Sequence, residues 1–145
     1  MHFLISLLLF WNVSNPNWNN NYKQAFENAK TEHKLVLINF SGSDWCGPCI
    51  RLHKDVFTLD AFNDIAESHL VLVNADFPRA KKNQLSATQQ KLNEEVADKY
   101  NNKGSFPFTV LVNSNGEIIK SWEGYPSNIN DFIEDLRETI RTNLN

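Results

Sequence analysis

The sequence contains only two cysteines, Cys46 and Cys49, among its 145 residues. Two thiols cannot build the several bridges of a small disulfide-stapled domain, nor supply four thiolates to a zinc ion. The chain also lacks a basic excess, because its formal net charge is -3. The positive surface that binds a phosphate backbone is therefore missing, and we expect no nucleic acid among its partners.

Glycine and proline are scarce as well, with five residues of each. This scarcity argues against a disordered or collagen-like chain. Hydrophobic residues make up 41% of the sequence and include ten phenylalanines. A chain of this length and composition is suited to one compact domain with its own core.

No apolar run is long enough for a membrane span, which needs about 20 residues. The longest, FLISLLLFW at residues 3–11, is about half that length and is followed at once by polar residues. This pattern predicts a signal peptide over residues 1–15 and hence a periplasmic or otherwise extracytoplasmic protein. The alternatives are a hydrophobic helix or strand that packs on the domain, and a cytoplasmic location. The asparagine-rich residues 16–21 are interpreted as a polar linker before a domain over residues 22–145.

Hydrophobic periodicity places helices and strands in alternation along the domain. An amphipathic helix begins at Tyr22, and the continuous apolar run at residues 35–40 predicts a strand that is buried on both faces. Helices are expected over residues 46–57 and 59–68, and a second buried strand over residues 70–74.

The second half of the chain carries clear start and stop signals. Ser86 and Gln89 have the spacing of a capping box, which predicts a helix up to Tyr100. Strands at residues 108–112 and 118–122 flank an Asn-Gly turn, and an amphipathic helix follows from Ser127 or Asn128. The order of elements predicts an α/β fold, with helices on both faces of a mixed sheet.

The two cysteines lie in the sequence Trp45-Cys46-Gly47-Pro48-Cys49, directly after a buried strand and at the start of a helix. Unpaired N–H groups and the helix dipole favour an anion there, so the pKa of Cys46 should be lowered. Cys46 is then the nucleophile, and Cys49, one turn into the helix, attacks the resulting mixed disulfide. Pro48 is tolerated in the first helical turn, and Gly47 leaves the approach to the sulfur open.

Other roles for the cysteine pair are weaker. A bridge that closes so short a loop removes little chain entropy, so a purely stapling disulfide is disfavoured. Zinc would need two more ligands, and no histidine forms a second closely spaced pair, so we expect no metal. His53 shares a helix face with Cys49, but we interpret it as a partly exposed surface histidine.

These motifs resemble the thioredoxin-fold thiol-disulfide oxidoreductases, in particular an exported bacterial branch. The resemblance runs from about Tyr22 to Leu144 and includes the Ser105-Phe106-Pro107 segment, which is similar to the family's cis-proline loop facing the cysteines. It implies a thioredoxin-like fold and a site in which Cys46 and Cys49 are catalytic. It further implies that substrate is contacted by Trp45, Gly47, Pro48, Phe106 and Pro107.

The sequence departs from this family pattern in two places. Asn39 stands near the position of a buried aspartate that accepts the proton of the resolving cysteine, but an amide cannot take up a proton at neutral pH. The spacing from Asn39 to Cys46 is also one residue longer than usual. The segment between Asp76 and Pro107 is longer too, and it either shapes a partner surface or elaborates a loop neutrally.

The resulting hypothesis is an enzyme that reduces disulfides in exported proteins without a cofactor. Since the chain has no third cysteine, a separate thiol donor must re-reduce it, and the resemblance suggests a membrane-embedded thiol transporter. The alternatives are a disulfide oxidase or isomerase, and a non-catalytic module that binds peptides through an apolar patch at Trp45 and Phe106.

Overall fold

The computed structural model describes residues 16–144, so the predicted signal peptide at residues 1–15 lies outside the described part. Five strands, five α-helices and one short 3-10 helix alternate along this part. In chain order they are β1 (Trp18–Asn19), α1 (Tyr22–Glu32), β2 (Leu35–Ser41), α2 (Gly47–Asp55), α3 (Asp60–His69), β3 (Leu70–Asp76), η1 (Lys81–Asn83), α4 (Ala87–Tyr100), β4 (Phe108–Val112), β5 (Ile118–Glu123) and α5 (Ile129–Asn143).

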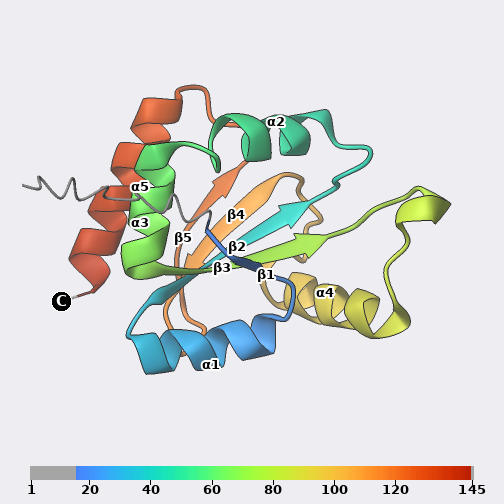
Figure 1. Ribbon diagram of the computed structural model, residues 1–145, viewed down its shortest axis with the longest axis horizontal. Helices are drawn as coiled ribbons and strands as arrows, with labels where there is room; N and C mark the ends of the chain where they lie inside the picture. The colour runs from blue at the N-terminus through green and yellow to red at the C-terminus, as the bar shows by residue number, and fades with distance from the viewer. Residues whose placement is uncertain (1–15, 145) are drawn as a thin grey trace, which may run out of the picture.

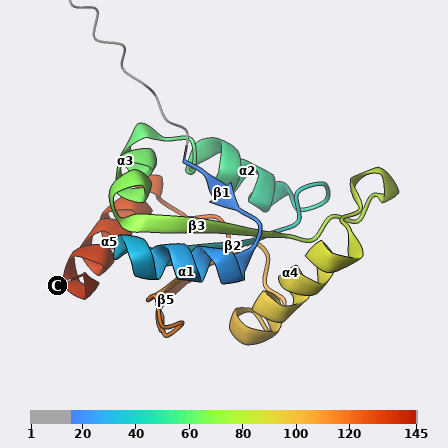
Figure 2. The same cartoon turned by 60° about the horizontal axis from the view of Figure 1, so that its bottom comes forward.

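The strands form one mixed sheet in the order β1-β3-β2-β4-β5. β1, β3 and β2 are parallel, whereas β4 is antiparallel to both β2 and β5. Helices α1 and α4 cover one face of the sheet and α2, α3 and α5 cover the other (Figures 1 and 2). The predicted α/β fold, with helices on both faces of a mixed sheet, is confirmed.

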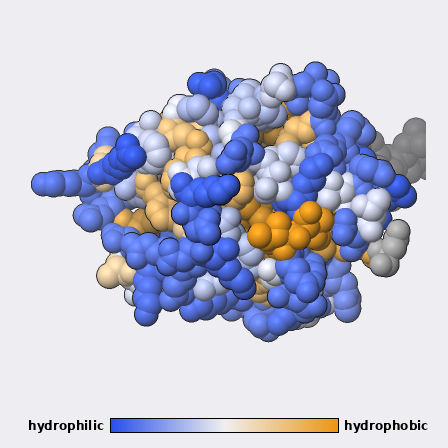
Figure 3. Space-filling view, turned by 180° about the vertical axis from the view of Figure 1, so that it is seen from behind, coloured by the Kyte–Doolittle hydropathy of each residue, from blue (hydrophilic) through white to orange (hydrophobic). Residues whose placement is uncertain are grey.

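β2 is buried along its whole length, as its continuous apolar run predicts. Alternate side chains pack into two cores: Leu35 and Leu37 face α2, α3 and α5, while Val36 and Ile38 face α1 and α4. Seen from behind, the outer surface is mainly polar and its apolar side chains gather in a few areas (Figure 3). The buried central strand therefore provides a rigid support for the loop and helix that follow its carboxyl end.

The structure differs from the sequence expectations in the segment before α1. Residues 16–21 were expected to be a linker, but Trp18 and Asn19 form the edge strand β1 against Leu72 and Val73. The Trp18 ring packs on Phe57, with centroids 4.9 Å apart. A strand of two residues has no periodicity that a sequence could reveal, so tertiary packing decides its conformation.

The prediction that α4 starts at Ser86 is confirmed, but only one of the two hydrogen bonds of the expected capping box forms. Ser86 Oγ accepts a hydrogen bond from the Gln89 N–H at 3.1 Å. The Gln89 side chain does not return to the Ser86 N–H; its Nε2 donates to the Asn20 carbonyl at 2.6 Å instead. This hydrogen bond ties the segment before α1 to α4.

Candidate active site

Cys46 and Cys49 lie at the carboxyl end of β2, where helix α2 begins. Cys46 is the N-cap of α2, and its Sγ accepts a hydrogen bond from the Cys49 N–H at 3.3 Å. The two sulfurs form a disulfide, with Cα atoms 5.2 Å apart. Cys46 keeps 6% of its surface exposed and Cys49 none, so an incoming thiol or disulfide reaches Cys46 first. The backbone N–H aimed at Cys46 would stabilise a thiolate once the bridge is reduced.

The loop before Cys46 holds Trp45 against the segment that follows β3. Trp45 Nε1 donates to the Phe77 carbonyl at 2.7 Å. The indole also fills the space above Gly42, where a Cβ atom would lie 2.3 Å from the ring. Glycine at position 42 is therefore required for this position of Trp45, which the sequence did not reveal.

An aromatic cluster adjoins the disulfide. It consists of Trp45, Phe77 and Phe106, and the Phe106 ring centroid lies 5.5 Å from each of the other two. The Arg79 guanidinium lies over the Trp45 indole, 3.6 Å from its centroid. Sequence reasoning found Trp45 and Phe106 but missed Phe77 and Arg79, which are brought to the site only by the fold.

The Phe106-Pro107 peptide bond is cis, as predicted. The Pro107 carbonyl accepts a hydrogen bond from the Gly124 N–H at 2.8 Å, and β4 begins at Phe108. Phe106 therefore lies just before the residues of β4 that are hydrogen-bonded to the neighbouring strands. Gly47 and Pro48, which stand between the two cysteines in the sequence, are exposed. Of the predicted substrate contacts, the structure brings Phe106 to Trp45, the residue that precedes Cys46.

Asp44 fixes the segment after β3 to the active-site loop. Its carboxylate accepts hydrogen bonds from the backbone N–H groups of Arg79 and Ala80, both at 2.9 Å, and from Asn83 Nδ2 at 3.0 Å. These hydrogen bonds, that from Arg79 first, lower the pKa of Asp44. The long segment between Asp76 and Pro107 therefore begins as part of the active-site rim.

A buried polar group lies beneath the cysteines, on the sheet face that α2 covers. Asn39 is fully buried, and its Nδ2 donates to Thr109 Oγ1 at 3.0 Å. Its Oδ1 lies 2.9 Å from Nε2 of His53 on α2. His53 is half-buried, as the prediction of a partly exposed residue requires, but it is not a free surface side chain, because its ring turns inward to this amide and packs against Trp18 and Phe57. The i, i+4 spacing from Cys49 was the available signal.

Burial lowers the pKa of His53 below its ordinary value of 6.5, and the negative charge of Asp76 opposes this shift in part. The folded protein therefore holds a neutral ring under conditions in which the unfolded chain is already protonated. As the pH falls through 6.5, the unfolded state gains a proton first and the free energy of unfolding decreases.

We expect the His53→Gln substitution to flatten this part of the stability profile. Glutamine retains a polar side chain near Asn39 but does not titrate, so its free energy of unfolding should decrease less than that of the wild type between about pH 7 and pH 5. Urea titrations across this range measure the difference. His69→Gln, at an exposed position on α3, is the matched control and should keep the wild-type slope. Parallel profiles for the wild type and His53→Gln would contradict a neutral buried ring.

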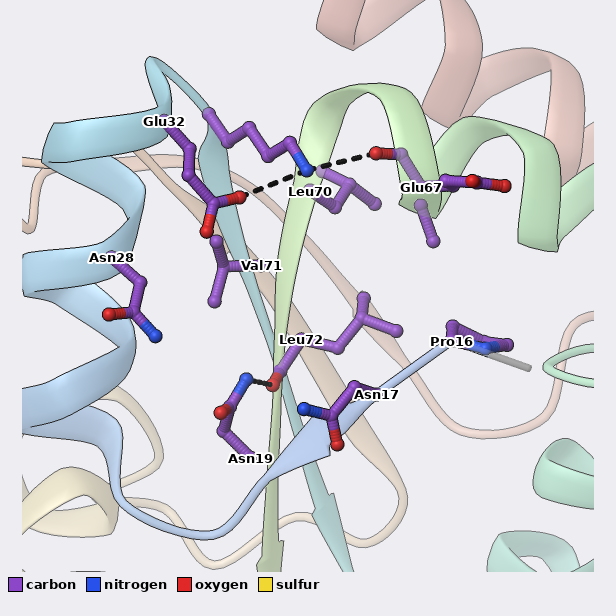
Figure 4. Close-up of a pocket in the computed structure, with 11 residues that line it drawn as sticks. Pro16, Asn17, Asn19, Asn28, Glu32, Glu67, Leu70, Val71 and Leu72 are labelled. Atoms are coloured by element: carbon purple, nitrogen blue, oxygen red, sulfur yellow. Dashed lines mark hydrogen bonds and ion pairs between the residues drawn. The ribbon is translucent and has the colours of Figure 1, made fainter. Parts of the chain in front are cut away.

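A cavity of about 320 Å³ lies at the other end of the sheet, between β1, α1 and the end of α3 (Figure 4). Its rim is polar: Asn19 Nδ2 donates to the Leu72 carbonyl, and Lys34 contacts both Glu32 and the Glu67 carbonyl. It is remote from the carboxyl end of β2, where the cysteines lie. We therefore assign no part of the thiol chemistry to it.

Two further properties concern residues 16–144. No helix in this part combines the length and the apolar character needed to cross a membrane. No three His, Cys, Asp or Glu side chains come together there as metal ligands would.

A cysteine pair at the first turn of a helix, within this fold, defines a thiol-disulfide oxidoreductase. The chain belongs to the thioredoxin-like domain family, which it matches over residues 22–139. It is 34% identical over 129 residues to the disulfide bond reductase DsbH of Chlamydia pneumoniae, an alignment that covers 89% of this chain and 75% of that protein.

Solved structures agree with this assignment. A DsbH oxidoreductase superposes with a TM-score of 0.79 at 25% identity, covering 97% of this chain and 95% of the other. A thioredoxin from Thermus thermophilus superposes with a TM-score of 0.66 over 86% of this chain and 87% of its own. Its identity is only 18%, so this second likeness concerns the fold alone.

Proposed function

We propose that this protein reduces disulfides in other, exported proteins. The observation that carries the proposal is the position of Cys46 as the N-cap of α2, with Sγ accepting the Cys49 N–H at 3.3 Å. The Cys46 thiolate attacks a substrate disulfide and releases one substrate thiolate, which takes up a proton. The Cys49 thiolate then attacks Cys46 Sγ, the mixed disulfide breaks, and the Cys46–Cys49 bond forms. Two electrons thus pass from the cysteine pair to the substrate.

The direction of this reaction depends on the reduction potential of the cysteine pair. The Gly47-Pro48 dipeptide resembles that of the reducing members of the fold, and the 34% identical relative is named a disulfide bond reductase. We expect a potential near about -270 mV, as in thioredoxin, and far from the -120 mV of a strong oxidant. Equilibration with glutathione buffers, followed by thiol alkylation and mass analysis, measures it. A value near that of the oxidant would instead support the disulfide oxidase alternative.

The aromatic cluster and the cis-proline loop are the proposed substrate groove. An extended substrate segment would lie along the backbone of Phe106 and Pro107, with Trp45 on one side and Gly47-Pro48 on the other. In an insulin reduction assay with a dithiol donor, precipitation should require both cysteines. Suppression of aggregation by a variant without either cysteine, together with no reductase activity, would favour the peptide-binding alternative.

A separate thiol donor must return the pair to its reduced form, since the sequence contains no third cysteine. We propose a membrane thiol transporter as that donor and an extracytoplasmic location for the enzyme. The support is the apolar run at residues 3–11. Intact-mass measurement of the protein from its native compartment should show a chain without about the first 15 residues. A full-length chain in the cytoplasm would contradict export but not the redox activity.

A further inference from the structure

The proposed function requires Cys49 to lose a proton before it attacks Cys46. Cys49 is fully buried, so bulk water does not reach its sulfur in this structure. A buried thiol also ionises with difficulty, because burial disfavours its charged form. A group inside the protein must therefore take up this proton.

The face of the sheet beneath Cys49 is apolar except at its carboxyl end. Asn39 and Thr109 are paired in the register of β2 and β4, and both side chains are buried. Asn74 stands beside Asn39 on β3, and its Oδ1 is buried without a hydrogen-bond partner in the described part of the chain. Buried polar groups cost free energy unless they are hydrogen-bonded. A cluster of such groups beneath Cys49 is therefore a candidate for a functional role.

His53 is the member of this cluster that can accept a proton. An amide such as Asn39 does not accept one at neutral pH, and neither does the Thr109 hydroxyl. The nearby carboxylate of Asp76 already accepts hydrogen bonds from the N–H and the hydroxyl of Ser43. Within this cluster, the imidazole is the group that can take up a proton near neutral pH, and it lies on the inner face of α2 against Asn39.

The hydrogen bonds also determine which ring nitrogen is free. Asn39 donates to Thr109 through Nδ2, so its Oδ1 is the acceptor that faces His53. Nε2 of His53 must then carry the hydrogen, and Nδ1 of the neutral ring has an open lone pair. Residues four apart on a helix have Cβ atoms about 5–6 Å apart, a separation that a direct contact or one bridging water spans.

Burial, and not a neighbouring charge, keeps the ring neutral, so that it has a lone pair with which to accept a proton. Trp18 of β1 and Phe57 after α2 pack against it, with ring centroids 5.5 and 5.0 Å from that of the imidazole. The charged group that acts on it is Asp76 of β3, whose effect is smaller than that of burial. On α2, the Asp55 carboxylate is engaged by the Tyr125 hydroxyl at 2.9 Å.

We propose, resting on the proposed function, that His53 is the base that accepts the Cys49 proton when the mixed disulfide is resolved. The proton leaves Cys49 Sγ for His53 Nδ1, and the Cys49 thiolate attacks Cys46 Sγ. The bond between Cys46 and the substrate sulfur breaks, and the imidazolium returns its proton to the departing substrate thiolate or to water. Asn39, held by Thr109, is a positioning residue that fixes the tautomer of the ring.

A disulfide reagent that releases one coloured thiolate per step separates the two reactions. Reduced protein mixed with excess 5,5′-dithiobis(2-nitrobenzoate) should give a first phase, proportional to reagent, from Cys46. A second phase, independent of reagent, reports the attack by Cys49. In the wild type the second rate should rise with pH and level off once the ring is neutral.

In His53→Gln the second phase should be slower by at least about tenfold at pH 7, as expected for the loss of a general base. It should also keep rising with pH through the neutral range, because the thiol then depends on hydroxide. The first phase should stay within about twofold of the wild type, and His69→Gln should leave both phases unchanged. A merely structural role would not alter the pH profile of one phase alone.

A second phase in His53→Gln with the wild-type rate and pH profile would overturn the proposal while leaving the proposed function intact. If that variant does not fold, Asn39→Leu tests the same proposal. This substitution removes the amide oxygen that fixes the tautomer of His53 but keeps the imidazole ring. Its second phase should slow by several-fold, and an unchanged second phase would again count against the base. A wild-type protein whose Cys46 released no coloured thiolate would overturn the proposed function instead.

Discussion

Cys46→Ser should abolish disulfide reduction, with a loss on the order of 10³-fold or more, whereas Cys49→Ser should still attack substrate but stop at the mixed disulfide. The asymmetry follows from the structure: Cys46 lies at the helix N-terminus with 6% of its surface exposed, whereas Cys49 is fully buried. A hydroxyl at position 46 is not ionised at neutral pH and cannot start the exchange.

The measurement is insulin turnover together with non-reducing gels and intact-mass analysis of each variant after incubation with a disulfide-bonded protein. Cys49→Ser should appear as a covalent adduct that a dithiol removes, and Cys46→Ser should form none. The double variant is the control for non-specific adducts. An adduct on Cys46→Ser with none on Cys49→Ser would mean that the two roles are reversed.

The position of the cysteine pair at the start of α2 and most of the fold were predictable because their signals are local in sequence. The continuous apolar run of β2, the cysteines at a strand-to-helix junction and the cap at Ser86 each lie within a few residues. Such patterns reflect backbone geometry and burial, which neighbouring residues largely decide.

The rest of the site depends on contacts between distant residues, and these have no local signal. Trp45 meets Phe77 and Arg79 across more than 30 positions of sequence, and the contact forms only because β2 and β3 end at the same edge of the sheet. The same holds for β1, whose two residues are ordered by packing and not by propensity.

Asn39 and His53 illustrate the limit most clearly. From the sequence, Asn39 was a departure from a family position and His53 a partly exposed surface residue one turn after Cys49. Each was assessed alone, and neither points to the other. The 2.9 Å contact between them arises from the packing of α2 on β2, which is a property of the tertiary structure. A polar side chain in a buried and mainly apolar strand requires a polar partner, and that partner comes from an element that only the tertiary structure brings near.

The largest expected effect on stability is that of Phe62→Ala. Phe62 of α3 is fully buried in the core between the sheet and helices α2, α3 and α5. Its ring centroid lies 4.8 Å from that of Phe57 and 6.3 Å from that of Trp18. Alanine would remove the ring from the centre of this aromatic group and leave a cavity, so we expect a loss of about 3–5 kcal/mol in the free energy of unfolding.

Urea denaturation of the oxidised protein, monitored by tryptophan fluorescence and by circular dichroism, tests this value. Ile118→Ala is the control, because Ile118 on β5 is 58% exposed and its truncation should change stability by no more than about 0.5 kcal/mol. A loss for Phe62→Ala below about 1 kcal/mol would mean that α3 and β1 collapse into the vacated space. A domain of this kind is stabilised by about 5–15 kcal/mol, so the expected loss is a large part of its total stability. Because β1 packs on this aromatic group through Trp18, β1 should be the first element to detach from the sheet.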